Sequence, residues 1–315
     1  MGTELTGKKK RSFIRGLLWF ALGFLALIGI STLVTSWAPD QMVGTDKGLG
    51  LVEVTGVIQN SQDIVRQIKE FREDKRIRGI VVRIDSPGGA VGPSQEIYDE
   101  VLKTRKSGKT IYASMGTLGA SGGYYIASSA DRVFANPGTL TGSIGVIMAF
   151  SNIEGLMNKI GLQPEVIKAG KYKDTGSPVR PMSIKERSLL QGVVADVHQQ
   201  FIEAIAEGRK LPVEEIRKIA DGRIFTGRQA YRLQLIDQLG GLQASIDHLA
   251  RKVGISGSPK IIREKKRVNF LDWILNAAIN QPIIKKYLPT SHSPLQYLWP
   301  LAKPHLPVSL PYPPS

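Results

Sequence analysis

The stretch Gly79–Gly89, GIVVRIDSPGG, places a short β-branched run directly before a glycine-rich turn. The run predicts a strand buried in a sheet, and Pro93 then opens a helix that reaches about Lys106. Strand-like and helix-like segments alternate from there to about Ala169. Such alternation predicts an α/β fold with a parallel sheet and crossover connections.

The other elements follow from the spacing of apolar residues. Further strands are expected at Leu51–Ile58, Thr110–Met115, Ser143–Phe150 and Gln163–Ala169. Helices are expected after Ser61, over Ala120–Ala130 and around Ile153–Ile160. Between Ile184 and Leu249 the pattern is almost entirely helical, which predicts a helical region after the α/β part.

Three glycine-rich stretches, residues 85–94, 119–127 and 141–146, each follow an apolar strand. Glycine at a strand end lets backbone N–H groups point at a ligand, because no Cβ blocks the approach. In the second stretch, GASGGYYIA, Ser121 lies at a strand-to-helix turn between small residues, a placement typical of a hydrolase nucleophile. The alternative is that Ser121 only caps the helix that follows.

A nucleophilic serine needs a general base, and the composition restricts the choice. The chain has no cysteine, and its histidines lie in helical segments or in the C-terminal tail: His198, His248, His292 and His305. The segment KAGKYKD supplies lysines after an apolar strand instead: Lys168, Lys171 and Lys173. A lysine base needs a pKa lowered from ~10.4 to ~7.5, which demands burial in an apolar site. A solvated loop is the alternative, and the pattern does not choose among the three lysines.

The net charge of +15 lies mainly at the two ends of the chain. Residues 1–15 contribute +4 and residues 251–315 contribute +8, so the 235 residues between them are nearly neutral. This distribution argues against a nucleic-acid-binding surface on the body of the chain.

The run Gly16–Pro39 has 24 residues and no charge, enough to cross a bilayer core of ~30 Å as a helix. Trp19 and Trp37 lie near its ends, where aromatic rings prefer the membrane interface. The basic cluster before the run predicts a cytoplasmic N-terminus, one pass through the cytoplasmic (inner) membrane, and a body on the periplasmic or outer face. The alternative is a cleaved signal peptide, whose apolar core is usually shorter, ~7–15 residues.

The last 34 residues hold nine of the 18 prolines. This composition predicts an extended, polyproline-like tail rather than a packed core. One interpretation is a disordered end. The other is that its apolar residues dock along a groove of the same or a neighbouring subunit: Leu295, Tyr297, Leu298 and Trp299.

Five motifs in fixed order resemble the signal peptide peptidase A family of serine–lysine membrane proteases, in its short single-domain form. They are GIVVRIDSPGG, ASGGYYIA, NPGTLTGSIGV, KAGKYKDTGSP and DGRIFTGRQAYRLQLIDQLGG, and they span about residues 50–250. The resemblance implies a Clp protease/crotonase-like superhelix of β-β-α units with a helical C-terminal extension. It divides the chain into a cytoplasmic basic N-terminus (1–15), a transmembrane anchor (16–39), a linker (40–48), a protease domain (49–255) and a basic, then proline-rich tail (256–315).

The resemblance also implies a role for individual residues. Ser121 matches the nucleophile of the family, and Lys173 matches its general base. Gly88 and Gly122 match the two residues whose N–H groups stabilise the oxyanion, and Ser143 matches the hydroxyl that orients the lysine. The resemblance implies no metal, nucleotide or other cofactor.

In short family members the serine and the lysine meet across a subunit boundary, so the resemblance implies a homo-oligomeric ring with shared active sites. The implied substrates are signal peptides left in the membrane after preprotein processing, and other apolar peptides. Three alternatives remain: an acyl-CoA enzyme of the crotonase type, a related serine protease that acts on other membrane proteins, and an inactive membrane scaffold of the same fold.

Overall fold

The computed structural model describes residues 47–264, the strand at 296–298, and the single residues Trp19 and Gly23. The chain divides into two units, Met1–Asp46 and Lys47–Ser315, and nearly all described residues belong to the second. Apart from Trp19 and Gly23, the expected membrane span lies outside the described residues. Among those that are described, no helix is both long and apolar enough to span a bilayer.

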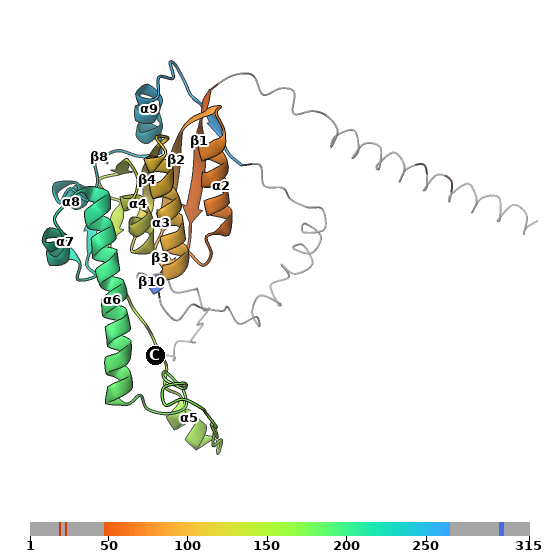
Figure 1. Ribbon diagram of the computed structural model, residues 1–315, viewed down its shortest axis with the longest axis vertical. Coiled ribbons are helices and arrows are strands. Elements are labelled where there is room, and N and C mark those ends of the chain that lie inside the picture. Colours follow the sequence, from red (N-terminus) through yellow and green to blue (C-terminus); the bar gives the residue numbers. More distant parts are fainter. Residues whose placement is uncertain (1–18, 20–22, 24–46, 265–295, 299–315) are drawn as a thin grey trace, which may run out of the picture. The chain divides into compact units, whose positions relative to one another are not determined.

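A mixed sheet forms the centre of the second unit (Figure 1). Its strands are β1 (Gly48–Thr55), β2 (Ile77–Ser86), β4 (Thr110–Ala120), β5 (Arg132–Ala135), β6 (Leu140–Gly142), β7 (Ile224–Thr226), β8 (Gln238–Leu239) and β9 (Lys260–Ile262). The main order is β7-β6-β4-β2-β1-β9, and all of these pairs are parallel except β6–β7. The prediction of an α/β fold with a parallel sheet is therefore confirmed.

Strand β4 changes partner along its length. Its first half pairs with β5 from Tyr112 to Met115, and its last residues, Leu118–Ala120, pair with β6. The strand runs five residues further than the sequence pattern predicted. The pattern missed these residues because they are mostly small and do not form a β-branched run. This extension carries the chain to the position of Ser121.

Both faces of the sheet are covered. One face packs against α2 (Gln62–Glu73), α3 (Val91–Lys106), α4 (Gly122–Ser128) and the second half of α6 (Ile184–Arg209). The opposite face carries Leu51, Val81 and Tyr112 and is covered by α9 (Leu242–Lys252). Neighbouring residues of one strand point to opposite faces, so the central runs Leu49–Val52 of β1 and Gly79–Val82 of β2 are apolar and buried, as expected of strands covered on both sides.

The first half of α6 extends away from the sheet and carries an arm, residues 147–183, that contains α5 (Glu154–Lys159) (Figure 1). The predicted helix around Ile153–Ile160 is confirmed by α5. The predicted strands at 143–150 and 163–169 are wrong. The chain leaves the sheet at Gly142, and residues 163–169 are exposed, so neither segment finds a neighbouring strand among the described residues.

Two short helices, α7 (Val213–Ile219) and α8 (Gly227–Arg232), complete the helical region predicted after residue 184. Outside the main sheet, β3 (Gly88–Ala90) pairs in antiparallel orientation with β10 (Gln296–Leu298). The other edge of β3 contacts Ile58, whose N–H donates to Gly88 O at 2.9 Å and whose carbonyl accepts from Ala90 N at 2.7 Å. The backbone of Gln296–Leu298 in the tail therefore docks on its own chain.

Candidate active site

Ser121 lies in the turn between β4 and α4, with φ 54° and ψ −121°. A residue other than glycine rarely adopts a positive φ, and holding one there costs on the order of 1–3 kcal/mol. Ser121 occupies the N-cap position of α4, yet its hydroxyl makes no capping hydrogen bond. The alternative that Ser121 is simply a helix cap therefore fails, and the turn instead has the strained geometry of a nucleophile elbow.

Ser143 lies beside Ser121 because the two strands that precede them pair with each other. Ala120 is opposite Gly142 in the β4–β6 ladder, and the N–H of Ser121 donates to Gly142 O at 2.8 Å. Ser143 also has a positive φ, 51°, and its N–H donates to Arg223 O at 2.8 Å. Both serines are almost completely buried. The structure thus places the predicted nucleophile and the predicted orienting hydroxyl at one edge of the sheet.

Gly88 reaches the same edge from β2. The last residue of β2, Ser86, pairs with Gly119 of β4, two residues before Ser121. The N–H of Gly88 donates to Ser86 Oγ at 3.1 Å, and Ser86 Oγ donates to Gly56 O at 2.6 Å. An oxyanion at this point must therefore share or replace the bond to Ser86, which the sequence analysis did not include. A serine two residues before the glycine, as in DSPGG, is the signal that could have indicated it.

Gly122 is the first residue of α4, so its N–H lies at the helix start beside Ser121. Gly123 follows closely packed: a Cβ there would lie 3.0 Å from Ser86 O. Small residues are needed in this turn because α4 packs directly against the end of β2. The sequence GASGG thus serves both the close packing and the exposure of backbone N–H groups.

The described histidines make no hydrogen bond to Ser121. His248 belongs to α9, where Nδ1 lies 3.1 Å from the hydroxyl of Tyr112 on the face that α9 covers. His198 belongs to α6, and its buried Nε2 has no hydrogen-bond partner in the described part of the chain. His292 and His305 fall outside the described residues.

The structure distinguishes the three candidate lysines. The Lys168 ammonium forms an ion pair with Asp174, and the Lys171 ammonium lies 5.5 Å from the ring centre of Tyr172. Lys173 is exposed, and its ammonium has no hydrogen-bond or ion-pair partner in the described part of the chain. A general base needs an amine that no carboxylate holds in the charged form. This condition excludes Lys168 and leaves Lys171 and Lys173, of which Lys173 is the one that the family resemblance implies.

Comparison with known proteins identifies the family. Residues 103–256 match the family model of peptidase family S49, and residues 53–141 match that of Clp protease. A Synechocystis protein assigned as a protease is 44% identical over 198 residues, which are 62% of this chain and 71% of that protein. The chain belongs to peptidase family S49. It is a serine protease, and the acyl-CoA alternative is set aside.

Other relatives of this S49 peptidase carry more specific names. An Enterococcus faecium protein assigned as signal peptide peptidase SppA is 34% identical over 218 residues, which are 69% of this chain and 63% of that protein. The chloroplastic serine protease SPPA of Arabidopsis thaliana is 36% identical over 202 residues, which are 64% of this chain and 30% of that protein. Each match covers roughly two thirds of this chain.

Within one chain of this S49 peptidase, Lys173 and Ser121 do not meet. Lys173 lies on the arm, which Figure 1 shows at the end of α6 remote from the sheet. Among the described residues, no hydrogen bond joins the lysine to Ser121 or Ser143. One chain therefore holds the serine half of the predicted site and, separately, the lysine half.

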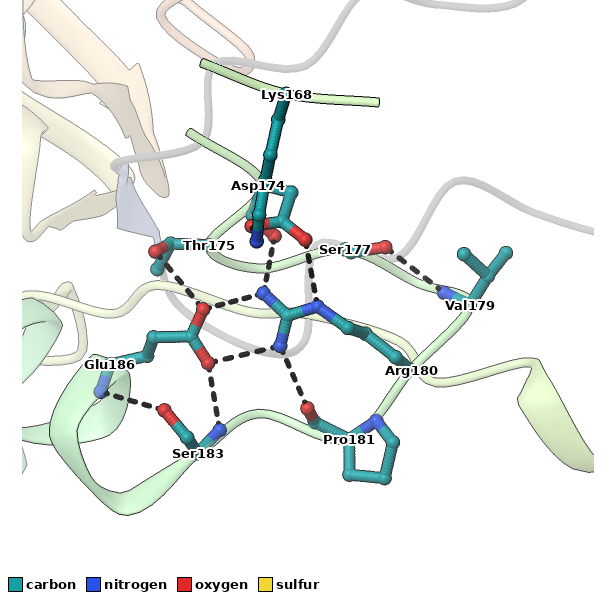
Figure 2. Close-up of polar contacts among 9 residues, drawn as sticks. All are labelled: Lys168, Asp174, Thr175, Ser177, Val179, Arg180, Pro181, Ser183 and Glu186. Atoms are coloured by element: carbon teal, nitrogen blue, oxygen red, sulfur yellow. Dashed lines mark hydrogen bonds and ion pairs between the residues drawn. The ribbon is translucent and has the colours of Figure 1, made fainter. Parts of the chain in front are cut away.

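The loop that carries Lys173 is fixed to the start of α6 by a cluster of charged groups (Figure 2). Arg180 Nε donates to Asp174 Oδ2 at 2.9 Å, and its Nη2 and Nη1 donate to the two oxygens of Glu186 at 2.5 and 3.0 Å. Glu186 and Ser183 form a capping box at the N-terminus of α6. Sequence analysis missed Arg180 and Glu186, although the S-x-x-E spacing from Ser183 is a recognisable start signal.

Proposed function

We propose that this S49 peptidase is a membrane-anchored endopeptidase of the cytoplasmic membrane that degrades signal peptides left after preprotein processing. Its nucleophile is Ser121, and its general base is Lys173 of a neighbouring copy in a homo-oligomer. The observation that carries the proposal is the strained, uncapped Ser121 turn, combined with a free Lys173 that the same chain holds elsewhere. A site divided in this way needs a second copy to complete it.

The arm has the surface expected of a segment that a neighbouring copy covers. Helix α5 buries none of its residues, and Ile167 is 96% exposed. Exposed apolar side chains continue along the arm and onto α6: Ile147, Phe150, Ile153, Leu156, Ile160, Leu162, Val166, Ile184, Leu189 and Val193. A contiguous apolar surface of this kind usually marks a protein–protein interface.

The proposed chemistry uses the groups already located. Neutral Lys173 accepts the proton of the Ser121 hydroxyl as the serine oxygen attacks the scissile carbonyl. The N–H groups of Gly88 and Gly122 stabilise the oxyanion, and Ser143 orients the lysine amine. Lys173 then returns the proton to the leaving amine, and water hydrolyses the acyl-enzyme by the same proton route.

Substrate binding is proposed at the edge of β3. An extended segment, Gln296–Leu298, already pairs with this edge, which supports its ability to receive a peptide strand. The N-terminal span predicted at 16–39 would hold the site near apolar peptides in the membrane. Fractionation and protease accessibility of the full chain in membrane vesicles test this part: the body is expected in the membrane fraction and on the extracytoplasmic side.

The shared site is tested by mixing two inactive variants. Ser121→Ala removes the nucleophile, and Lys173→Ala is expected to lower kcat/KM for a signal-peptide substrate by about 10²–10⁴. When the two variants are co-assembled in equal amounts, roughly a quarter of all sites combine an intact serine with an intact lysine from the neighbour. Recovery of about that share of wild-type activity is expected.

A site formed within one chain would give no recovery, because every chain in the mixture lacks one of the two groups. Labelling with a fluorophosphonate, followed by mapping of the modified residue, identifies the nucleophile independently. Label at Ser121 is expected, whereas label at Ser86 or Ser143 overturns the assignment. Full activity of Lys173→Ala overturns the dyad.

A further inference from the structure

The carboxylate of Asp174 is adjacent in sequence to Lys173, yet it is bound on the other side by two cations. The Lys168 ammonium pairs with Oδ1, and Arg180 Nε donates to Oδ2 at 2.9 Å. Figure 2 shows the guanidinium of Arg180 between Asp174 and Glu186, with Lys168 reaching the same carboxylate. Of the three lysines considered at the start, Lys168 is thus paired with Asp174, and the charges of both Asp174 and Glu186 are matched by cations.

This arrangement bears directly on a lysine base. A carboxylate within ~4–6 Å of an amine stabilises its charged form and raises its pKa by 1–3 units. A general base must be neutral to accept a proton, so an unpaired Asp174 beside Lys173 would suppress catalysis near pH 7. In the structure the Asp174 carboxylate is mostly buried and occupied, and the pKa of that carboxyl is well below its usual range because Arg180 and Lys168 bind it.

We propose that Arg180 is a positioning residue that engages Asp174 and so keeps this carboxylate from pairing with the Lys173 amine. This inference rests on the proposed function, since it assumes that Lys173 is the base. Arg180 is suited to the task because one planar guanidinium reaches Asp174 and Glu186 at once, which a lysine ammonium cannot do. Glu186, almost completely buried at the start of α6, fixes the guanidinium in place.

The other charged groups around the lysine are few. The Lys173 side chain is exposed. The other ionisable groups on its loop and at the adjoining helix start are Lys168, Lys171, Tyr172, Asp174, Arg180, Lys185, Glu186 and Arg187. On the serine side, the ion pair nearest Ser143 is Arg223–Asp221, which is matched within itself. Asp174 is therefore the acidic group closest in sequence to the base.

The test is the pH profile of kcat/KM for the full-length oligomer with a peptide substrate. Its acid limb reports the pKa of the base in the free enzyme. For Arg180→Gln the midpoint of this limb is expected to rise by about one pH unit, which lowers the rate about tenfold below the limb and leaves it nearly unchanged well above. Lys168→Gln, which removes the other cation, is expected to shift the limb in the same direction.

The double variant Asp174→Asn/Arg180→Gln separates electrostatics from loop structure. Because the carboxylate is gone, its acid limb is expected to return to the wild-type midpoint even if the plateau stays low. Arg66→Gln is the matched control, since Arg66 also joins two carboxylates, Asp63 and Glu264, but lies on α2. Its profile is expected to match the wild type.

Two results would overturn the inference. One is a uniform loss of rate in Arg180→Gln with an unmoved midpoint, which indicates a structural role only. The other is a shifted midpoint that persists in the double variant, which means that Asp174 is not responsible. Neither result affects the dyad itself, because that assignment fails only if Lys173→Ala retains activity or Ser121 is not labelled.

Discussion

Ser121 shows how a single residue can be held in a conformation that its own chemistry disfavours. Its amide is bound to Gly142 O, and its carbonyl accepts from Tyr125 N at 2.8 Å, so the turn is fixed on both sides. The fold maintains the positive φ because the ends of β4 and β6 and the start of α4 converge on this residue. The strain is a cost to stability that leaves the hydroxyl without a capping hydrogen bond.

Replacing Ser121 by glycine should therefore remove both activity and strain. Left-handed backbone costs a residue with a Cβ roughly 1–2 kcal/mol more than it costs glycine. We expect Ser121→Gly to be inactive but about 1 kcal/mol more stable than Ser121→Ala, which keeps the Cβ. Urea unfolding of the two variants checks this, and equal midpoints would mean that the turn is relaxed.

At this scale the sequence located most of the candidate site but not its supports. Ser121 was identified from its place in a glycine-rich turn, and Gly88, Gly122 and Ser143 were implied by the family resemblance. The structure brings their strands together because parallel strands end at one side of the sheet. The hydroxyl of Ser86 on Gly88 N–H was not predicted, because a serine in a turn has many possible partners.

At the scale of elements, strands could be predicted where an apolar run is buried on both faces of the sheet. They were uncertain where an isolated apolar segment has no strand beside it. β1 and β2 are confirmed within a few residues, because apolar β-branched runs have few alternatives inside a sheet. Residues 163–169 have the same local pattern but no neighbouring strand among the described residues. The local sequence pattern shows that a segment is apolar, but it does not show which other element will cover that segment.

The loop from Asp174 to Glu186 should have a distinct dependence on pH. Arg180 lowers the pKa of both carboxyl groups below their ordinary values, so their contribution to loop stability is complete above about pH 4. This contribution is lost progressively as the pH falls below that point, because protonation of Asp174 and Glu186 then favours a loop without these ion pairs.

Hydrogen exchange of the peptide 174–186, corrected for the intrinsic rate at each pH, measures this effect. Protection is expected to stay constant from pH 7 to about 5 and to decrease below about 4. Peptides from β1 and β2, whose protection comes from the buried sheet, provide the comparison. A loop as protected at pH 3 as at pH 6 would contradict the assigned role of the ion pairs.

At the scale of the whole molecule, the exposed apolar side chains of the arm and the separation of Lys173 from Ser121 are the two observations behind the proposed assembly, in which each copy completes its neighbour. Composition had already narrowed the chemistry, since a chain without cysteine and without a suitably placed histidine leaves lysine as the base for serine. The separation of Lys173 from Ser121 could not be derived from spacing, because nothing in a linear pattern gives the direction of α6.

Disrupting the pairing of the tail with β3 should change how the enzyme responds to substrate concentration. The Gly88 carbonyl and the Ala90 N–H face Ile58, so in an extended strand the polar groups of Gly89 face the other side, opposite Tyr297. Tyr297→Pro removes the N–H at that position and is expected to lower KM for a peptide substrate while leaving kcat unchanged.

Gln296→Pro is the matched control for this variant, because the N–H of Gln296, the residue before Tyr297, points away from β3. Its KM is expected to stay near the wild-type value. An unchanged KM in Tyr297→Pro would show that the tail does not occupy the edge that substrates use.

The pairing of β10 with β3 also sets a threshold for turnover. A segment tethered to its own binding edge acts as a competitor at an effective concentration on the order of millimolar. A free peptide at micromolar concentration loses this competition with the tail. A peptide confined to the thin layer of a membrane reaches a local concentration comparable to that of the tethered tail. Under the proposed function, in which substrates bind at the β3 edge from the membrane, the tail would make the enzyme respond to the local density of substrate in the bilayer rather than to its abundance in solution.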